Sequence, residues 1–230
     1  MSPRRRMMIA IAVAFVPLQT CVALAANAPF DDVRGQSPVQ GDATRGAAKA
    51  AACAACHGAQ GVATAPTFPN LAGQSPTYLY VQLRAFKDGA RDNAVMKPMA
   101  SLLSDQDMRD VAAHFAALPG KTASAAATAD SRGGTLFHEG DPRKGIPPCQ
   151  GCHGSDGRGP RPDAASTAPQ PAWSTFPALA GQNAIYVMEQ LKAFREGTRI
   201  GTSNDKVMQG VARNLDDADI QALAAYLATQ

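Results

Sequence analysis

The pentapeptide Cys-x-x-Cys-His occurs twice in this chain and constrains its fold more than any other feature. The copies are Cys53-Ala-Ala-Cys56-His57 and Cys149-Gln-Gly-Cys152-His153. This spacing is the attachment signature of c-type haem. Two thiols form thioether bonds to the haem vinyl groups, and the adjacent histidine binds the iron from one face. The sequence therefore predicts two covalently bound haem c groups, held by the four cysteines, with both histidines as iron ligands.

Two other chemistries use cysteines at this spacing. A thioredoxin-like redox pair expects a βαβ context, and no strand pattern appears in this sequence. Two Cys-x-x-Cys pairs can also close a zinc site. Such pairs usually lie about 15–20 residues apart, whereas Cys53 and Cys149 are 96 positions apart. Haem attachment is favoured over both alternatives.

The first 25 residues have the pattern of a secretory signal peptide. A basic start with three arginines precedes an apolar run over 7–16, and Ala23-Leu24-Ala25 forms a cleavage signal. We predict export and cleavage after Ala25. An uncleaved anchor is disfavoured because polar residues and Pro17 interrupt a run that is barely long enough to span a bilayer. Lipidation at Cys21 is disfavoured because Thr20 is not the small residue usual at that position.

Removal of this leader changes the charge balance. The full sequence has 22 Lys and Arg residues against 19 Asp and Glu residues. The leader contains three arginines and no carboxylate, so the mature polypeptide is formally neutral. Nucleic-acid-binding domains are usually strongly basic. We therefore expect no nucleic-acid partner.

The rest of the sequence is a tandem duplication. Phe68-Pro-Asn-Leu-Ala-Gly-Gln returns 108 positions later as Phe176-Pro-Ala-Leu-Ala-Gly-Gln. At the same offset, six further residues recur: Tyr78, Gln82, Leu83, Phe86, Gly89 and Arg91 return as Tyr186, Gln190, Leu191, Phe194, Gly197 and Arg199. This period is too long for a solenoid. We predict a signal peptide over 1–25, domains over 26–120 and 131–230, and a linker over 121–130 that is poor in large apolar residues.

Each copy is predicted to be all-α. Ser75 and Pro76 are typical of a helix start and Gly89 of a helix end, with Asn183 and Gly197 in the equivalent places. A capping-box pattern opens a second helix in each copy, at Ser104 and at Asp216. Helical spacing predicts a buried stripe on each: Met108, Val111, Ala112 and Phe115 in the first copy, and Ile220, Leu223, Ala224 and Leu227 in the second. An alanine-rich helix is expected over 43–52. Domains of about 90–100 residues often need a staple, which covalently held haem would supply.

Methionine is the leading candidate for the second axial ligand, because a thioether raises the haem potential relative to a second imidazole. Met96 aligns with Met208, each seven residues before a leucine that precedes a helix cap. Met99 aligns with Val211, an ordinary apolar position. We favour Met96 and Met208 as ligands. A gap-filling role in the core suits Met99, Met108 and Met188 better.

The remaining histidines do not repeat between the copies. His114 is expected to pack on a helix, and His138 to be solvated in a loop. A ligating imidazole normally donates its other N–H to a fixed acceptor. The carbonyl groups of Pro69 and Pro177, in the two Phe-Pro-x-Leu loops, are the predicted acceptors.

With both pentapeptides, both Phe-Pro-x-Leu-Ala-Gly-Gln loops and both upstream methionines in place, the chain resembles the di-haem cytochrome c4 family. That resemblance covers the mature chain and implies two tandem class I cytochrome c domains with haems facing each other. It implies His57/Met96 and His153/Met208 ligation. It also implies a periplasmic electron carrier, often membrane-associated, in a respiratory chain. Its donor would be a quinol-oxidising complex or a dehydrogenase, and its acceptor a terminal oxidase.

Three functions remain open at this level. The first is a one-electron shuttle with no catalytic residues, since two filled axial positions leave no room for a substrate at the iron. The second is a haem enzyme with a labile ligand. The third is the cytochrome subunit of a dehydrogenase. The second copy departs from the family in a long loop, Ser155 to Thr175, with four prolines and the only tryptophan, Trp173. The loop is either a mobile insert or a docking surface for a partner.

Overall fold

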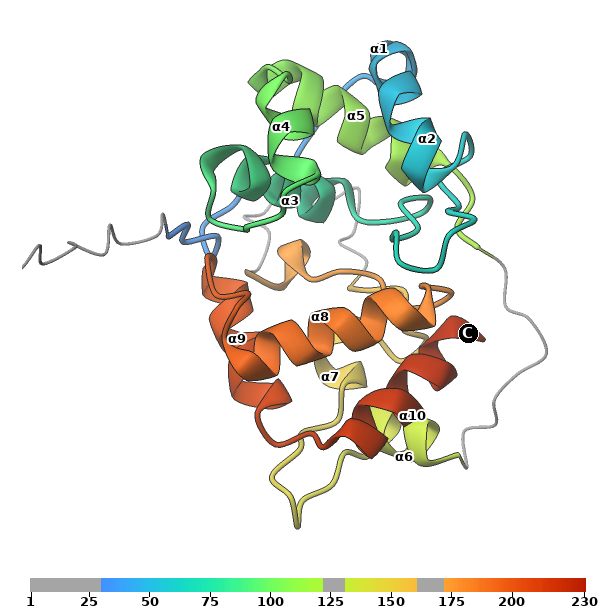
Figure 1. Cartoon of the computed structure of the whole chain (residues 1–230), viewed down its shortest axis with the longest axis vertical. Coiled ribbons are helices and arrows are strands. Elements are labelled where there is room, and N and C mark those ends of the chain that lie inside the picture. Colours follow the sequence, from blue (N-terminus) through green and yellow to red (C-terminus); the bar gives the residue numbers. More distant parts are fainter. Residues whose placement is uncertain (1–29, 122–130, 161–171) are drawn as a thin grey trace, which may run out of the picture.

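Two helical domains stack along the long axis of the molecule (Figure 1). This computed structural model describes residues 30–121, 131–160 and 172–230. The first domain contains α1 (Ala43–Ala50), η1 (Ala51–Cys53), α2 (Ala54–His57), α3 (Pro76–Asp88), α4 (Met96–Ser101) and α5 (Asp105–Ala117). The second contains α6 (Arg132–His138), α7 (Gln150–His153), η2 (Ala172–Thr175), α8 (Ala184–Glu196), α9 (Ser203–Ala212) and α10 (Asp217–Ala228). Within these ranges the only β-structure is two isolated bridges.

The predicted helix ends are present in both domains. The Ser75 hydroxyl caps α3, and Gly89 ends that helix with φ of 79°. Full capping boxes start α5 at Ser104 and α10 at Asp216. These local signals fix the ends of the helices that pack each core.

A helix crossing organises each domain, and a glycine makes it close. In the first domain α1 crosses α5, and a Cβ on Gly46 would lie 2.0 Å from the carbonyl oxygen of Asp110. In the second domain α6 crosses α10, and a Cβ on Gly133 would lie 2.1 Å from the carbonyl oxygen of Ala222. Ala50 of α1 is also buried, in the core that α1 shares with α5. Glycine is required because backbones touch here.

The apolar stripes of the terminal helices form the two cores. In α5 the buried apolar residues are Met108, Val111, Ala112 and Phe115. In α10 they include Ile220, Leu223, Ala224 and Leu227. Both stripes agree with the sequence analysis, and burial of Met108 agrees with its predicted core role. Two short helices, α4 and α9, carry Met96 and Met208, and neither was predicted from the sequence.

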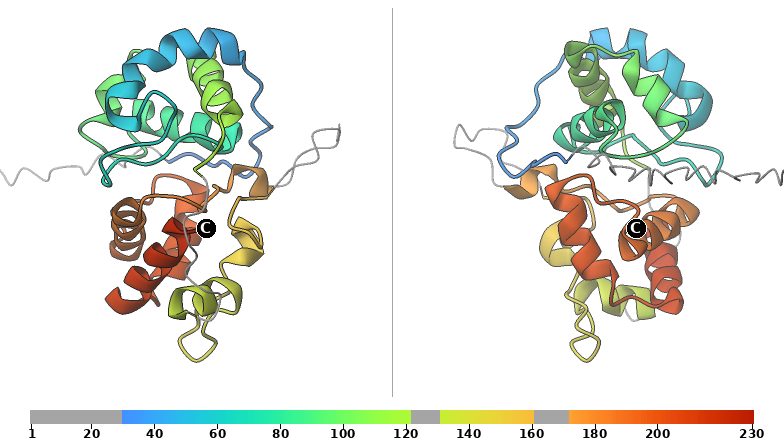
Figure 2. Two further views of the ribbon diagram at one scale, coloured as in Figure 1. Left: turned by 90° about the vertical axis from the view of Figure 1, so that its right-hand side faces the viewer. Right: turned by 60° about the vertical axis from the view of Figure 1, so that its left-hand side comes forward.

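Two segments extend this plan. In the second domain a loop over 139–148, which contains a bridge between Asp141 and Ile146, separates α6 from the haem motif. The N-terminal segment from Phe30 reaches the boundary between the domains before it enters α1 (Figure 2). The predicted signal peptide and nearly all of the predicted linker lie outside the described residues. Within the described part, no helix is both long and apolar enough to cross a membrane.

Candidate functional site

One continuous, largely apolar cavity runs through both domains and reaches both pentapeptides. Its walls in the first domain include Cys53, Cys56, His57, Met96 and Met99. Its walls in the second include Cys149, Cys152, His153, Met208 and Val211. The structure thus brings every sequence-predicted cysteine, histidine and methionine to a single space. Leucine and phenylalanine side chains from α3, α5, α8 and α10 complete the lining.

The two histidines are held in the same way. His57 Nδ1 lies 2.9 Å from the carbonyl oxygen of Pro69, and His153 Nδ1 lies 3.0 Å from that of Pro177. A carbonyl only accepts, so Nδ1 carries the proton and donates it. This tautomer leaves Nε2 with a lone pair, as a ligand nitrogen requires. Burial lowers the pKa of both imidazoles, which favours the neutral form.

The four motif cysteines form no disulfide, which leaves all four sulfurs available for thioether bonds to haem. Burial raises the pKa of the Cys53 thiol, and it raises the pKa of the Cys149 thiol to about 11. A reactive redox cysteine has a lowered pKa instead. In the described ranges, no group of three or more His, Cys, Asp or Glu residues could hold a metal ion. Neither the thioredoxin-like nor the zinc alternative fits these surroundings.

The structure agrees with the predicted core role of Met188 but not with that of Met99. Met188 packs against the second core, as expected. Met99, in contrast, is not a core residue, because 37% of it is exposed and it lines the cavity beside Met96. In the short helix α4 that carries it, Ala100 is the buried residue. The preference for Met96 over Met99 stays a prediction.

His138 is also placed differently from the prediction, which had it solvated in a loop. It is the last residue of α6 and is half-buried. Its Nε2 lies 2.7 Å from the hydroxyl of Tyr226, and its Nδ1 lies 3.2 Å from Oε1 of Gln150. The prediction failed because the residue ends a helix whose crossing partner, α10, supplies the tyrosine. His114 is half-buried on α5, with its ring 5.1 Å from that of Phe115.

The repeated heptapeptides meet at the domain boundary, which the sequence analysis did not foresee. Oε1 of Gln182 accepts the N–H of Asn70 at 2.8 Å, and its Nε2 donates to the carbonyl of Asn70 at 2.9 Å. The equivalent glutamine of the first repeat makes the reciprocal contact. Oε1 of Gln74 accepts the N–H of Ala178 at 2.8 Å, and its Nε2 donates to the carbonyl of Ala178 at 2.9 Å. Each repeat therefore clasps the main chain of the other. The loops that carry the histidine acceptors are fixed to each other by these contacts.

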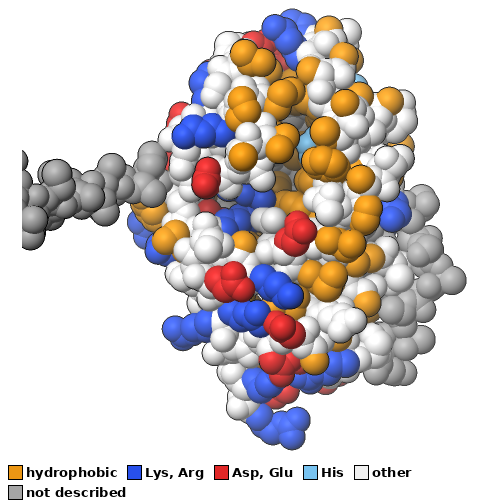
Figure 3. Space-filling model, viewed as in Figure 1, with side chains coloured by type: hydrophobic (Ala, Val, Ile, Leu, Met, Phe, Trp, Pro, Cys, Tyr) orange, Lys and Arg blue, Asp and Glu red, His pale blue; other side chains and the backbone are white. Residues whose placement is uncertain are grey.

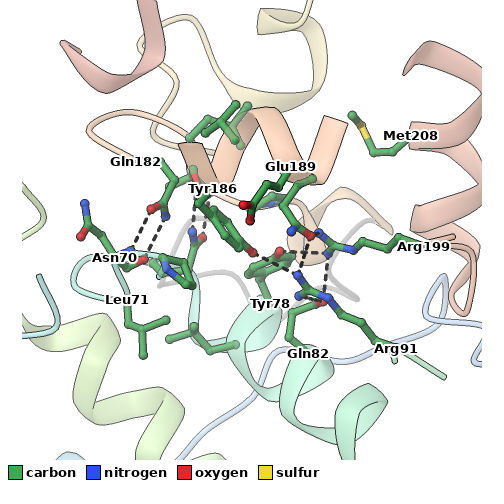
Figure 4. A pocket seen from close by; sticks show the side chains of 18 of the residues that line it. Asn70, Leu71, Tyr78, Gln82, Arg91, Gln182, Tyr186, Glu189, Arg199 and Met208 are labelled. Carbon is green, nitrogen blue, oxygen red and sulfur yellow. Dashed lines mark hydrogen bonds between the residues drawn. The ribbon is translucent and has the colours of Figure 1, made fainter. Parts of the chain in front are cut away.

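A second set of repeated polar residues forms a buried network at the same boundary (Figure 4). Arg91 donates to Gln82 at 2.6 Å, to Gln190 at 2.7 Å and to the hydroxyl of Tyr186 at 3.1 Å. Arg199 makes the equivalent bonds to Gln190 at 2.7 Å, to Gln82 at 3.0 Å and to Tyr78 at 3.2 Å. Each guanidinium also lies 4.5 Å from a phenylalanine ring of its own domain.

The charges in this network are not symmetric. Arg199 forms a buried ion pair with Asp205 at 3.2 Å, which helps to raise the pKa of Arg199. At the offset that aligns Met96 with Met208, Asn93 of the first repeat is equivalent to Asp205. Among the described residues, no carboxylate forms an ion pair with Arg91. Arg91 is nonetheless 92% buried. A buried charge without a counter-charge is costly, so this cavity suits a group that carries carboxylates, such as the haem propionates.

The comparisons with known proteins agree with this arrangement. A family model for cytochrome c matches residues 43–119 and 131–230. Cytochrome c4 of Pseudomonas aeruginosa is 42% identical over 193 residues, which cover 84% of this chain and 90% of that protein. The chain belongs to the cytochrome c4 family. This family membership confirms the all-α fold of two cytochrome c domains and the two covalently bound haem c groups.

Two further relatives of this cytochrome c4 family member are informative. The crystal structure of reduced recombinant cytochrome c4 from Pseudomonas stutzeri matches with a TM-score of 0.71 at 39% identity, covering 82% of this chain and 98% of that one. A thiosulfate dehydrogenase electron acceptor of Stutzerimonas stutzeri is 40% identical over 191 residues, which cover 80% of this chain and 82% of that protein. Cytochrome c4 homologues are electron-transfer proteins, and electron transfer is the role that these relatives share.

Proposed function

We propose that this chain is an exported one-electron carrier whose two haems are each closed by a histidine and a methionine. In this proposal His57 and Met96 bind the first iron, and His153 and Met208 bind the second. The observation that carries it is the single cavity lined by both complete ligand sets. The haem supplies the reversible one-electron couple of its iron.

The residues of the chain tune and protect that couple. Pro69 and Pro177 accept the Nδ1–H protons and so orient the two imidazoles. The largely apolar walls would shield a bound haem from water, which would disfavour the more highly charged oxidised state and raise the potential. Methionine ligation acts in the same direction. In this proposal each iron would be bound by a histidine and a methionine, which would leave no open position for a substrate, so no residue is assigned a catalytic role.

We further propose that the carrier works in the periplasm as part of a respiratory chain. Its donor would be a quinol-oxidising complex or a dehydrogenase, and its acceptor a terminal oxidase. On the face shown in Figure 3, hydrophobic side chains gather over the first domain, while charges of both signs lie over the second. Three exposed apolar residues of the first domain, Val95, Met99 and Leu102, lie in or directly beside α4, the helix that carries the proposed ligand Met96. Exposed apolar side chains beside a proposed haem site suit transient contact between redox proteins.

A second candidate function is the acceptor of electrons from a thiosulfate dehydrogenase. Two relatives that carry the name of such an acceptor, at 40% and 41% identity, favour it. The two candidates share one chemistry and differ in the donor. Reduction of the purified oxidised protein by a thiosulfate dehydrogenase with thiosulfate would support the second. Reduction by a quinol-oxidising complex alone would support the first.

A spectroscopic redox titration with and without cyanide tests the proposed closure of both sites. We expect two one-electron steps that cyanide does not alter on the timescale of turnover. Rapid cyanide binding at either iron would contradict a simple shuttle and favour a haem enzyme with a labile ligand.

A further inference from the structure

The N-terminal segment belongs structurally to both domains, although residues 30–42 precede the part of the chain that matches the cytochrome c family model. Val33 is 1% exposed and Val39 is 6% exposed, and both pack in the core of the first domain. The N–H of Val39 donates to the hydroxyl of Thr77 at 3.1 Å. This segment is therefore folded onto α3 and is not a loose extension.

The same segment forms main-chain hydrogen bonds with the second domain. The N–H of Asp31 donates to the carbonyl of Gly201 at 2.8 Å, and the N–H of Ser203 donates to the carbonyl of Asp31 at 3.0 Å. These two bonds make a parallel β-bridge. The N–H of Val33 adds a bond to the hydroxyl of Ser203 at 3.1 Å. Three hydrogen bonds thus join positions about 170 residues apart in the sequence.

An ion pair fixes the segment to the first domain at the same point. The carboxylate of Asp31 pairs with the guanidinium of Arg84 on α3, whose Nε lies 3.0 Å from Oδ2. Arg84 also donates to Oε1 of Gln36 at 3.1 Å. Both side chains of the ion pair are about three-quarters buried. The pair therefore links α3 of the first domain to the residue that bridges the second.

The part of the second domain held in this way is the start of α9. Thr202, 1% exposed, caps α9 in a capping box with Asp205. Behind it, a Cβ on Gly201 would lie 1.6 Å from the carbonyl oxygen of Ala90, so the turn is pressed against the first domain. Met208 lies in α9, three residues after Asp205. The start of α4, which carries Met96, has no such contact with the segment among the hydrogen bonds of the described residues.

We propose that residues 31–33 act as a positioning strap. They hold the start of α9, and through it Met208, against the first domain, so that the methionine of the second site stays in place. The inference rests on the proposed ligation by Met208 and adds that the first domain supports the ligand of the second. Strap residues are positioning residues and touch no reacting atom.

The strap is tested with variants of the full-length holoprotein. Arg84→Leu removes the ion pair, and Asp31→Pro removes the N–H that bridges to Gly201. An ion pair of this exposure is worth about a two- to fivefold change in an equilibrium constant. We expect cyanide to bind the second haem about two- to fivefold faster in Arg84→Leu and the first haem at an unchanged rate. The reversed pair, Asp31→Arg with Arg84→Asp, should restore most of the original rate.

Hydrogen exchange gives a readout that does not depend on the haem ligand. Peptides covering 201–212 should exchange faster in both strap variants, and those covering 93–101 should not. Lys49→Met, which breaks an ion pair with Asp107 in the first domain, is the matched control and should change neither readout. Unchanged exchange over 201–212 would overturn the strap. Faster exchange with unchanged cyanide binding would overturn its effect on Met208.

The failure of the proposed function would look different. If Met208→Ala left the iron–sulfur absorption of both haems intact, the ligand assignment would fall, whatever the strap variants did to hydrogen exchange. If Met208→Ala abolished that absorption at one haem while the strap variants behaved like the parent protein, only the strap would fall.

Discussion

Gln182 of the second domain clasps the main chain of Asn70 in the first, accepting its N–H at 2.8 Å and donating to its carbonyl at 2.9 Å. Both residues are buried. Pro69 directly precedes Asn70, and its carbonyl accepts a hydrogen bond from Nδ1–H of His57. The contact between domains and the orientation of the first histidine therefore depend on one short loop.

Gln182→Leu should destabilise the protein strongly. Leucine fills the space but leaves the buried N–H and carbonyl of Asn70 unpaired, at a cost of about 2–4 kcal/mol. Gln74→Leu should cost less, because Ala178 is only half-buried. Urea unfolding of the holoprotein measures both. Gln221→Leu, at an exposed position on α10, is the control; a similar loss in all three variants would show that the clasp contributes nothing specific.

Gly46→Ala and Gly133→Ala should both destabilise the fold, by about 1–3 kcal/mol, because the new methyl group meets a backbone carbonyl at the helix crossing. Gly210→Ala in α9 meets nothing within 4 Å and should instead stabilise by up to about 1 kcal/mol through helix propensity. Thermal unfolding compares the three. The same sign for all three changes would mean that close approach does not decide these positions.

Asp205→Asn should raise the potential of the second haem. Asp205 is a buried negative charge paired with Arg199, and its removal disfavours the more positive, oxidised iron. In a partly screened environment, removal of one nearby charge changes a haem potential by about tens of mV, which corresponds to a free energy on the order of 1 kcal/mol. A redox titration should show one step shifted and the other unchanged. Asp217→Asn, at an exposed carboxylate, is the control, and a shift of equal size there would argue against a local effect.

Asp110→Asn should reduce stability at neutral pH and have a smaller effect in acid. The Arg45 guanidinium and the Asp42 N–H bind the charged carboxylate and hold the pKa of Asp110 at about 2. An unfolded aspartate has a pKa of about 3.9. A lowered folded pKa adds stability above about pH 4, and this stability is lost as the pH falls through about 2.

Urea unfolding at pH 7, 4 and 3 measures this difference between Asp110→Asn and the parent protein. The difference should be constant from pH 7 to about pH 5 and shrink below that. Asp92→Asn makes the same change of charge at an exposed position and should show little difference at any pH. If the difference in unfolding free energy between Asp110→Asn and the parent protein grew as the pH fell, the lowered pKa assigned to Asp110 would be contradicted.

Local signals in the sequence were enough for the framework of this fold. Ser104 and Asp216 identify helix starts because a capping box involves only residues three apart. The stripe from Met108 to Phe115 identifies a buried face because helical spacing alone places it. The short helix α4 was missed because Pro98 disfavours a helix interior, and packing on α3 supports it instead.

The contacts between domains could not be predicted in the same way. Gln74, Gln182, Arg91 and Arg199 were visible as repeated residues, and polar residues that repeat among apolar ones could have signalled a shared buried role. Their partners lie in the other copy, more than 90 residues away, and no local pattern specifies that pairing. The contact of Asp31 with Gly201 has no signal in the repeat at all, because the segment occurs once.

The most direct test of the central claim is the iron–sulfur absorption of the ferric holoprotein in three variants, Met96→Ala, Met99→Ala and Met208→Ala. If each haem is closed by a histidine and a methionine, Met96→Ala and Met208→Ala should each remove half of the absorption and open one iron to cyanide. Met99→Ala should match the parent protein. Full absorption in Met96→Ala together with its loss in Met99→Ala would contradict the ligand assignment, and full absorption in Met208→Ala would contradict closure of the second site.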